Sequence, residues 1–292
     1  MNILISGCSS SIGKKIIPQL FSIGHKVVGL RRGNCVDTRF HQCISVDLLS
    51  IKELKVVAEI SAELLILLAW ETTPKAFWNN AVNFQWQEMS LRIVEIFQRT
   101  GGRKVLGIGT CAEYSWNKIS PLRETDETVP VTKYGQAKLA TLKGIEGIGI
   151  DFIWARVFFM FGASDPRGKL LVDLIDSCES QDSYVLSNPR NQLDFINVND
   201  VATALCAIIE SKTSGIYNLG NGIGYVVEDV AKEIFRQMDC EIELSDYAGV
   251  KTQSTVIANI DKLKALFGSQ RIKPLDLLIE ELLIERSNSL GQ

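Results

Sequence analysis

Residues 1–13 read MNILISGCSSSIG, a short apolar run over Asn2–Ser6 followed at once by Gly7 and then by Gly13. An apolar run, a glycine turn and an apolar helical pattern in that order are typical of a strand–turn–helix unit. Gly7 would permit the tight turn, and Gly13 would let the helix approach the strand closely. The backbone N–H groups at the helix start could then bind a pyrophosphate. An ordinary Gly/Ser-rich loop is the alternative, because Ser10 stands where the complete pattern has its middle glycine.

The rest of the first half repeats this alternation of short β-branched runs with longer segments of helical period. Such alternation predicts βαβ units around a parallel sheet, an α/β Rossmann-type, doubly wound fold. The predicted strands are Asn2–Ser6, Lys26–Leu30, Gln42–Val46, Leu64–Leu68, Arg103–Ile108 and Asp151–Arg156. The predicted helices are Ile12–Ile23, Ser50–Ile60, Asn79–Arg99 and Tyr134–Glu146.

The pattern loosens beyond about residue 160, where polar loops interrupt it. We therefore expect a dinucleotide-binding domain over 1–160 and a small, mainly substrate-binding lobe over 161–292. Two later apolar runs, Asp194–Val198 and Gly215–Leu219, are predicted to return to the sheet, within 193–219. The two parts of the molecule would then interleave along the chain.

Composition limits the partner. The 292 residues carry 31 Lys+Arg against 34 Asp+Glu, a formal charge of -3, with no basic tract. Phosphate-binding surfaces of nucleic-acid proteins are basic, so we expect no nucleic-acid partner and favour a small molecule. The longest apolar run, Leu64–Trp70, is far shorter than the roughly 20 residues of a membrane span. Because the start also lacks the pattern of a secretory leader, a cytoplasmic location is expected.

The seven cysteines stand at 8, 35, 43, 111, 178, 206 and 240, without a CxxC pair, and only His25 and His41 accompany them. Zinc sites are usually recognised by closely spaced Cys and His pairs. The sequence therefore predicts reduced thiols and no metal site.

The end of the second predicted strand indicates which cofactor binds. Many dinucleotide sites place a carboxylate there to bind the adenosine ribose, whereas this chain has Arg31 and Arg32. Arginines can hold a 2′-phosphate, so the sequence predicts NADP(H) as preferred and NAD(H) as possible. Two solvated arginines are the alternative. Asp47, after the third strand, would hydrogen-bond the adenine or cap the next helix.

A tyrosine and a lysine provide the strongest chemical signal. Tyr134 and Lys138 are four residues apart and so project from one face of a helix. A nearby cation lowers the pKa of a phenol, which suits Tyr134 to exchange a proton with a carbonyl or alcohol. Thr110 precedes them at the end of a strand, where open α/β sheets bind ligands. It would hydrogen-bond the same substrate oxygen, or it would only stabilise a turn.

Taken together, the segments SGCSSSIG, LLAWETTP, GTCAEY, YGQAK, WARVFFMFG, DFINVNDVA and GIYNLGNG resemble, in order and spacing, the extended short-chain dehydrogenase/reductase family of NAD-dependent epimerase/dehydratases. The resemblance covers nearly the whole chain. It implies an NAD(P)-dependent oxidoreductase, a Rossmann domain with a C-terminal substrate lobe, and nucleotide-activated sugars as substrates.

The resemblance also assigns residues. The catalytic set falls on Thr110, Tyr134 and Lys138. The cofactor-binding residues fall on Gly7, Ser9, Ser10, Ser11, Ile12, Gly13, Arg31, Arg32, Asp47, Leu48, Leu68, Ala69, Trp70, Tyr134 and Lys138. The substrate-binding residues fall on Thr72, Thr110, Cys111, Ala112, Phe159 and Asp194, and Asn83 matches the family's helix asparagine.

Positions at which this chain departs from the family pattern indicate which of the family's activities to expect. Dehydratases carry an Asp-Glu pair directly after the catalytic Thr, where this chain has Cys111 and Ala112, so dehydration is not expected. Glu113, one place later, is expected to face another way. Phe159 stands where many members carry a substrate-contacting Asn, and Arg31 replaces the ribose-binding Asp.

The main functional prediction is NADPH-dependent reduction of the 4-keto group of a CDP- or dTDP-linked 4-keto-6-deoxyhexose, in deoxysugar and surface-polysaccharide biosynthesis. The first alternative is an NAD-dependent nucleotide-sugar 4-epimerase. The second is a non-catalytic dinucleotide-binding protein on the same fold. The family resemblance also implies a homodimer that pairs through the helices within 81–97 and 134–142.

Overall fold

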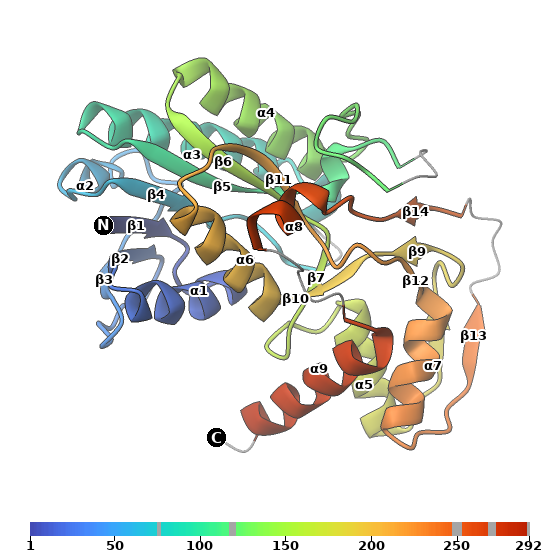
Figure 1. Ribbon diagram of the computed structural model, residues 1–292. Helices are drawn as coiled ribbons and strands as arrows, with labels where there is room; N and C mark the ends of the chain where they lie inside the picture. The colour runs from blue at the N-terminus through green and yellow to red at the C-terminus, as the bar shows by residue number, and fades with distance from the viewer. Residues whose placement is uncertain (75–76, 117–120, 247–252, 268–272, 291–292) are drawn as a thin grey trace. The chain divides into compact units, whose positions relative to one another are not determined.

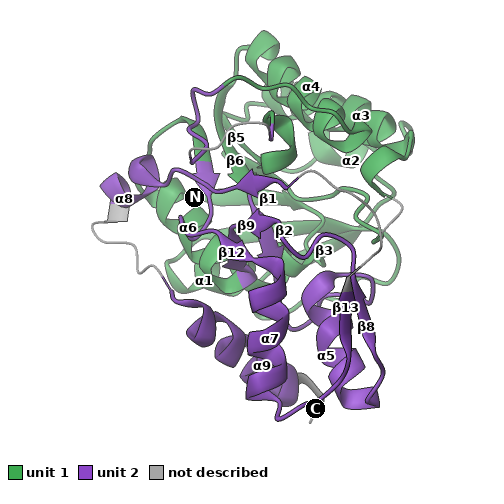
Figure 2. Ribbon diagram, turned by 90° about the vertical axis from the view of Figure 1, so that its right-hand side faces the viewer, with its two compact units in different colours: residues 1–115, 127–157, 199–217 green, residues 116–126, 158–198, 218–292 purple. Residues whose placement is uncertain are grey.

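The computed structural model describes residues 1–74, 77–116, 121–246, 253–267 and 273–290 (Figure 1). Two compact units make up the chain (Figure 2). Unit 1 comprises residues 1–115, 127–157 and 199–217, and unit 2 comprises residues 116–126, 158–198 and 218–292. The chain therefore passes between the units several times.

Unit 1 is built on a seven-stranded sheet in the order β11-β6-β5-β4-β1-β2-β3. The pairs from β3 to β6 are all parallel. This order reverses direction between β1 and β4, the feature at which doubly wound sheets bind ligands. The strands are β1 (Asn2–Ser6), β2 (Lys26–Arg31), β3 (Gln42–Ser45), β4 (Leu64–Leu67), β5 (Lys104–Thr110), β6 (Asp151–Val157) and β11 (Gly215–Leu219).

Helices cover both faces of this sheet, with α3 and α4 on one face and α1 and α6 on the other (Figure 1). The bounds are α1 (Ser11–Ser22), α2 (Lys55–Ala58), η1 (Phe77–Asn79), α3 (Val82–Arg99), η2 (Cys111–Glu113), α4 (Lys133–Ile148) and α6 (Val198–Glu210). The core under α3 and α4 joins strand leucines, such as Leu65, to Ile93 of α3 and Leu142 of α4. Coverage on both faces explains why every residue of β4 is buried.

The predicted α/β Rossmann-type fold is confirmed, and most predicted elements differ from the structure by one to three residues. The exception is the helix predicted over Ser50–Ile60, where only Lys55–Ala58 is α-helical. Residues before it form turns, in which the N–H of Ser50 bonds to the carbonyl of Asp47 and the N–H of Glu53 to that of Ser50. Leu54, at the N-cap, supplies no capping side chain, so the helix stays short.

Unit 2 consists of small sheets and helices. Its strands pair as β7 with β10, β9 with β12 and β14, and β8 with β13, and α7 packs against α5 and α9. The strands are β7 (Phe159–Phe161), β8 (Tyr184–Leu186), β9 (Gln192–Leu193), β10 (Phe195–Asn197), β12 (Tyr225–Val226), β13 (Leu244–Asp246) and β14 (Thr255–Val256). The helices are α5 (Leu170–Ser180), α7 (Val227–Gln237), α8 (Asp261–Phe267) and α9 (Leu275–Leu290).

Two predictions are wrong. Of the two later apolar runs predicted to join the main sheet, only Gly215–Leu219 does so, as β11. The run Asp194–Val198 contains β10, which pairs with β7 in a separate sheet. The thiols are also not all reduced, since Cys35 and Cys43 form a disulfide. Within the described ranges, no helix is both long and apolar enough to cross a bilayer.

Candidate active site

The glycine turn after β1 has the geometry of a phosphate-binding loop. Gly7 has a φ of +74°, and a Cβ there would lie 2.7 Å from the backbone nitrogen of Ala69, so the turn requires glycine. Ser10 is the N-cap of α1, with its hydroxyl accepting the N–H of Gly13 at 3.0 Å. The first turn of α1 contains no acidic side chain. The positive end of this helix is therefore free to attract a pyrophosphate.

Ser10 thus has a local function as a cap that a glycine could not perform through its side chain. Of its neighbours, Ser9 is exposed and Ser11 is half-buried at the helix start, whereas Ile12 and Gly13 are buried. Backbone groups and the two outer serines are accordingly the parts of this loop that a diphosphate can reach.

The ends of β2 and β3 lie at the same edge of the sheet. Arg31 is half-buried and donates from Nε to the carbonyl of Arg32 at 3.5 Å, and Arg32 is exposed. One oxygen of Asp47 accepts the N–H of Leu49 at 3.1 Å, which makes a local turn. Asp47 therefore does not cap a helix directly, because α2 begins eight residues later. Leu48 is buried.

The end of β4 passes beside the glycine turn. Leu68 donates its N–H to the carbonyl of Ser6 at 3.1 Å, and Ala69 donates to the Ser6 hydroxyl at 3.4 Å. Trp70 then turns towards α3, where its indole N–H bonds to Asn83 at 2.8 Å. Asn83 is fully buried and anchors this segment to the start of α3, while Thr72 is exposed.

Thr110 and Tyr134 are brought together where α4 begins. The Thr110 hydroxyl lies near the Tyr134 phenol and acts to lower its pKa, and it accepts the N–H of Ala112 at 3.2 Å. Gly135 makes this contact possible, since a Cβ there would lie 2.3 Å from the carbonyl oxygen of Ala112. Cys111 and Ala112 are both buried beside this junction.

Lys138 is buried on the same helix face. Its Nζ donates to the carbonyl of Ile108 at 2.9 Å and lies 3.7 Å from the centre of the Trp70 ring. Burial lowers the pKa of Lys138 to about 7, although the charge of Glu113 opposes this. The contact with Trp70 is a cation–π interaction that favours the charged form.

The pKa of Tyr134 differs from the prediction. It is raised, because burial outweighs the hydrogen bond from Thr110, and the charge of Glu113 acts in the same direction. Aromatic rings contribute to this burial, with Phe77 at 4.9 Å and Trp78 at 5.8 Å between ring centres. The Lys138 ammonium lies 5.9 Å from the centre of the Tyr134 ring, and a positive charge at this position favours the phenolate, against the effect of burial.

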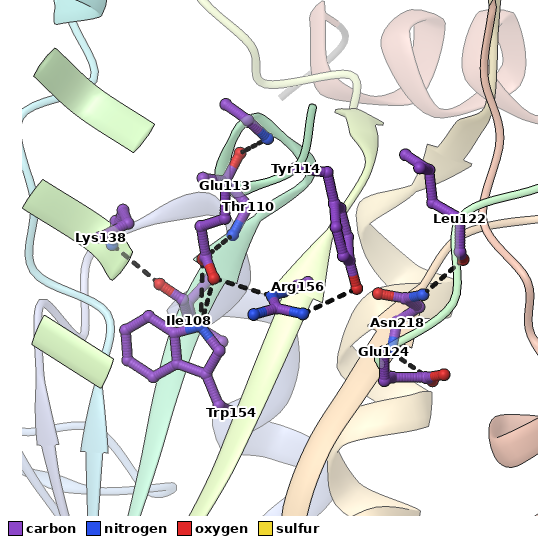
Figure 3. A network of polar contacts seen from close by, with 11 residues as sticks. Ile108, Thr110, Glu113, Tyr114, Leu122, Glu124, Lys138, Trp154, Arg156 and Asn218 are labelled. Carbon is purple, nitrogen blue, oxygen red and sulfur yellow. Dashed lines mark hydrogen bonds and ion pairs between the residues drawn. The ribbon is translucent and has the colours of Figure 1, made fainter. Parts of the chain in front are cut away.

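A buried ion pair holds the strand end that carries Thr110 (Figure 3). Glu113 accepts the N–H of Thr110 at 2.8 Å and pairs with Arg156 of β6 at 2.8 Å. Trp154 donates to the same carboxylate at 3.0 Å, and Arg156 also donates to the Tyr114 hydroxyl. Burial raises the pKa of Glu113, and Arg156 opposes that effect. Glu113 thus faces the interior of unit 1.

Two predicted substrate residues belong to unit 2. Phe159 is half-buried against Trp116 and Phe195, at 5.9 and 6.1 Å between ring centres. Asp194 is fully buried, and its carboxylate accepts three backbone N–H groups, from Asn221, Gly222 and Ala258. These bonds favour a structural role for Asp194 over the predicted substrate contact.

A search of protein-family models matches residues 3–220 to the NAD dependent epimerase/dehydratase family. The chain belongs to this family. Its members are NAD-dependent enzymes with an oxidoreductase-type fold, and the resemblance stated from the sequence motifs is confirmed. The matched range includes the glycine turn, Thr110, Tyr134 and Lys138.

Curated relatives of this family member act on nucleotide sugars. A UDP-glucose 4-epimerase of Lacticaseibacillus casei is 23% identical over 96% of this chain and 95% of its own. Another, from Halalkalibacterium halodurans, is 28% identical, but the match covers only 61% of each chain. A dTDP-6-deoxy-L-talose 4-dehydrogenase (NAD(+)) of Aggregatibacter actinomycetemcomitans is 21% identical over 83% of this chain and 93% of its own.

Solved structures share the fold at full length. The UDP-glucose 4-epimerase of Thermotoga maritima, solved with UDP-glucose, has a TM-score of 0.85 at 20% identity and covers 99% of this chain and 100% of its own. The Bordetella bronchiseptica enzyme WbmH, solved with NAD+, has a TM-score of 0.83 at 16% identity and covers 100% and 99%.

Sequence reasoning missed the residues that surround the predicted set. Arg156 and Trp154 hold Glu113, and Phe77 and Trp78 enclose Tyr134. The available signal was Arg156, a charged residue directly after the apolar run 152–155, because a buried charge requires a partner.

Proposed function

We propose that this chain is an NAD-dependent nucleotide-sugar 4-epimerase. The observation that carries the proposal is the set of Thr110, Tyr134 and Lys138 at the end of β5, in the same unit as the phosphate-binding turn. Relatives aligned over almost the whole chain support C4 epimerisation rather than net reduction. Cys111 and Ala112 argue against dehydration, because they stand where dehydratases carry the Asp-Glu pair that supplies the general acid and the general base.

The glycine turn and the start of α1 fit a bound dinucleotide, because a helix N-terminus attracts an anion and the first turn of α1 contains no acidic residue. The proposed cofactor-binding residues remain Gly7, Ser9, Ser10, Ser11, Ile12, Gly13, Arg31, Arg32, Asp47, Leu48, Leu68, Ala69, Trp70, Tyr134 and Lys138. NAD held by these residues would supply reversible hydride transfer at C4 of the sugar.

The side chains of the protein transfer the proton of the C4 hydroxyl and stabilise the charge that this transfer creates. In oxidation, Tyr134 takes the proton of the C4 hydroxyl, and in reduction it returns that proton to the C4 oxygen. Thr110 lies near Tyr134 and would orient the same oxygen. A charged Lys138 favours the phenolate of Tyr134 electrostatically, against the effect of burial. Phe77 and Trp78 enclose the Tyr134 ring and restrict its contact with water.

The test is interconversion of UDP-glucose and UDP-galactose by purified protein without added cofactor, followed by chromatography. Substrate deuterated at C4 should retain its label in the product, because the hydride returns to its original carbon. Tyr134→Phe should lower the rate by about 10²- to 10⁴-fold. Failure of every nucleotide-hexose pair to interconvert, with NAD supplied, would overturn the proposal.

Arg31 and Arg32 favour a second candidate, the NADPH-dependent 4-ketoreductase. NADPH oxidation with CDP- or dTDP-4-keto-6-deoxyglucose, lost in Tyr134→Phe, would establish it. If the Tyr134→Phe variant kept the full biological activity of the wild type in cells, a non-catalytic dinucleotide-binding protein would be favoured instead.

Three further assignments are proposals. Unit 1 binds the cofactor and unit 2 contributes to binding of the sugar nucleotide. The proposed substrate residues remain Thr72, Thr110, Cys111 and Ala112 of unit 1 and Phe159 of unit 2. A homodimer would pair through α3 and α4, and Phe84 on α3 is an exposed apolar side chain available for it. Light scattering on the purified chain tests the dimer. A cytoplasmic location remains a prediction from the sequence.

A further inference from the structure

Four metal-binding side chains gather at the edge of the sheet in unit 1. The ligand atoms of Cys8, His41 and Cys43 all lie within 4.8 Å of one another. The fourth, Cys35, is joined to Cys43 by the disulfide. No role in the proposed reaction requires any of these side chains.

The fold brings these residues together although they are distant in the chain. Cys8 follows Gly7 at the end of β1, and Cys43 pairs in register with Gly29 across β2 and β3. A Cβ placed on Gly29 would lie 2.8 Å from the sulfur of Cys8 and 2.9 Å from Cδ2 of His41. Both side chains therefore lie over Gly29, beside Cys43.

A neighbouring threonine orients the imidazole. The hydroxyl of Thr38 is hydrogen-bonded to Nδ1 of His41 at 2.9 Å. This bond leaves Nε2 as the ring nitrogen available to a metal, and Cδ2, its neighbour in the ring, lies over Gly29 as the Cys8 sulfur does. Zinc-binding histidines commonly use one ring nitrogen for the metal and fix the other by a hydrogen bond of this kind.

We propose that the reduced chain binds one zinc ion through Cys8, Cys35, His41 and Cys43. Three thiolates and one imidazole form a common structural zinc site, with bonds of about 2.3 Å to sulfur and about 2.0 Å to nitrogen. Donors in such a tetrahedron are about 3.8 Å apart or less, which lies within the 4.8 Å observed for the three grouped donors.

The disulfide and the metal exclude each other. Two molecules of a low-molecular-weight thiol reduce the Cys35–Cys43 bond, giving two cysteine thiols and one oxidised thiol dimer. Zinc then replaces the protons of three thiols, and three protons are released. The resulting centre carries one net negative charge. Arg31 interacts electrostatically with the Cys8 side chain, so its positive charge would partly compensate for this negative charge.

Binding would tie the segment 33–43 to the phosphate-binding turn, because Cys8 lies directly after Gly7. The oxidised chain instead ties residues 35 and 43 only to each other. The proposal does not depend on the proposed epimerase, because the measured quantity is bound metal.

The experiment compares full-length proteins kept reduced with a phosphine. Zinc content is measured by mass spectrometry after removal of loosely held metal, and cobalt(II) replaces zinc as a spectroscopic probe. We expect one zinc per chain, and a cobalt spectrum with thiolate charge transfer and tetrahedral bands. Cys206→Ala, a buried cysteine of α6 outside the cluster, is the matched control and should behave as wild type.

Cys35→Ser and His41→Ala each remove one proposed zinc ligand. Both side chains are half-buried, and each substitution should abolish the tetrahedral cobalt spectrum. Thr38→Val should weaken zinc binding by about 10- to 100-fold and keep the spectrum, as expected for a partner of a ligand. Circular dichroism verifies that each variant is folded. An absence of bound zinc in the reduced wild type, or an unchanged cobalt spectrum in either ligand variant, would overturn the proposal.

Discussion

Lys138 is the residue whose environment most affects its chemistry. It is only 5% exposed, and its ammonium contacts one carbonyl and the Trp70 ring. Burial disfavours the charged form, so its pKa falls to about 7 from an ordinary value of 10.5. The side chain is therefore partly neutral near pH 7. Its electrostatic effect on the Tyr134 phenol consequently varies over the physiological pH range.

This pKa predicts a pH-dependent stability. Between about pH 7 and 10.5 the unfolded chain binds the Lys138 proton and the native chain does not, so stability rises with pH in this window. The free energy of unfolding of wild type, minus that of Lys138→Met, should increase by about 2 kcal/mol from pH 7 to pH 9. Urea unfolding at several pH values measures it.

The matched control is Lys143→Met, at an exposed position of the same helix. It should change stability by less than about 0.5 kcal/mol at each pH. A wild-type minus Lys138→Met difference that stays flat with pH would show that Lys138 is charged in the native chain.

Single-residue patterns predicted part of the candidate site. Tyr134 and Lys138 are one helical turn apart, and Thr110 ends a strand, so local spacing sufficed to group them. The direction of the Tyr134 pKa was not predictable, because Phe77 and Trp78 reach its ring from a segment more than fifty residues away. For the same reason the sequence could not show that Asp194 bonds to residues 221, 222 and 258.

At the scale of elements, the junction of α4 with η2 sets the position of Tyr134. Gly135→Ala should force the first turn of α4 away from Ala112, since the added Cβ would lie 2.3 Å from the Ala112 oxygen. We expect a loss of stability of about 1–3 kcal/mol and a lower rate in the proposed epimerase assay.

Gly147→Ala, in the same helix, provides the opposite control. A Cβ there meets nothing within 4 Å, so the alanine should stabilise the chain by about 0.5–1 kcal/mol through helix propensity. Denaturant unfolding and activity measure both variants. Equal effects of the two substitutions would contradict the close contact between α4 and η2.

The pair of Glu113 and Arg156 joins η2 to β6 in the interior. Glu113→Gln leaves the buried Arg156 charge without its carboxylate, and should cost about 3–5 kcal/mol of stability. Glu88→Gln breaks an exposed pair with Arg92 on α3 and should cost at most about 0.5 kcal/mol. Urea unfolding compares the two, and similar losses would mean that the Glu113 site is accessible to water.

Elements with strong apolar periodicity were predictable, and weakly capped ones were not. The strand β4 consists of four buried aliphatic residues and was predicted to within one residue. The segment 50–60 has helical spacing, but Ser50 forms a hydrogen-bonded turn with the carbonyl of Asp47, and no side chain caps the helix at Leu54. Local hydrogen bonds of this kind compete with helix formation.

At the scale of the whole molecule, strand pairing was the hardest feature to predict. The runs 194–198 and 215–219 have similar apolar patterns, yet only the second joins the seven-stranded sheet. The first pairs with β7, which follows β6 almost directly. Periodicity identifies a strand but not its neighbour, because pairing depends on contacts distant in sequence. The Cys8, His41 and Cys43 cluster was missed for the same reason.

Cofactor binding is also a property of the whole molecule, because a ligand that binds only the native chain stabilises it. Free NAD at a hundred times its dissociation constant should add about 2.7 kcal/mol to the free energy of unfolding. Thermal unfolding with NAD, and separately with NADP, measures this. As a family member proposed to be an epimerase, the wild type should be stabilised more by NAD.

Arg31 decides between the proposed function and its competitor in this experiment. Arg31→Asp places a carboxylate at the end of β2, which should repel a 2′-phosphate and accept hydrogen bonds from a ribose hydroxyl. Stabilisation by NADP should therefore fall, while stabilisation by NAD is kept or increased. Arg103→Asp, the same charge change at the exposed N-terminal end of β5, should alter neither. A wild type stabilised mainly by NADP, with a preference for NAD in Arg31→Asp, would favour the 4-ketoreductase over the 4-epimerase.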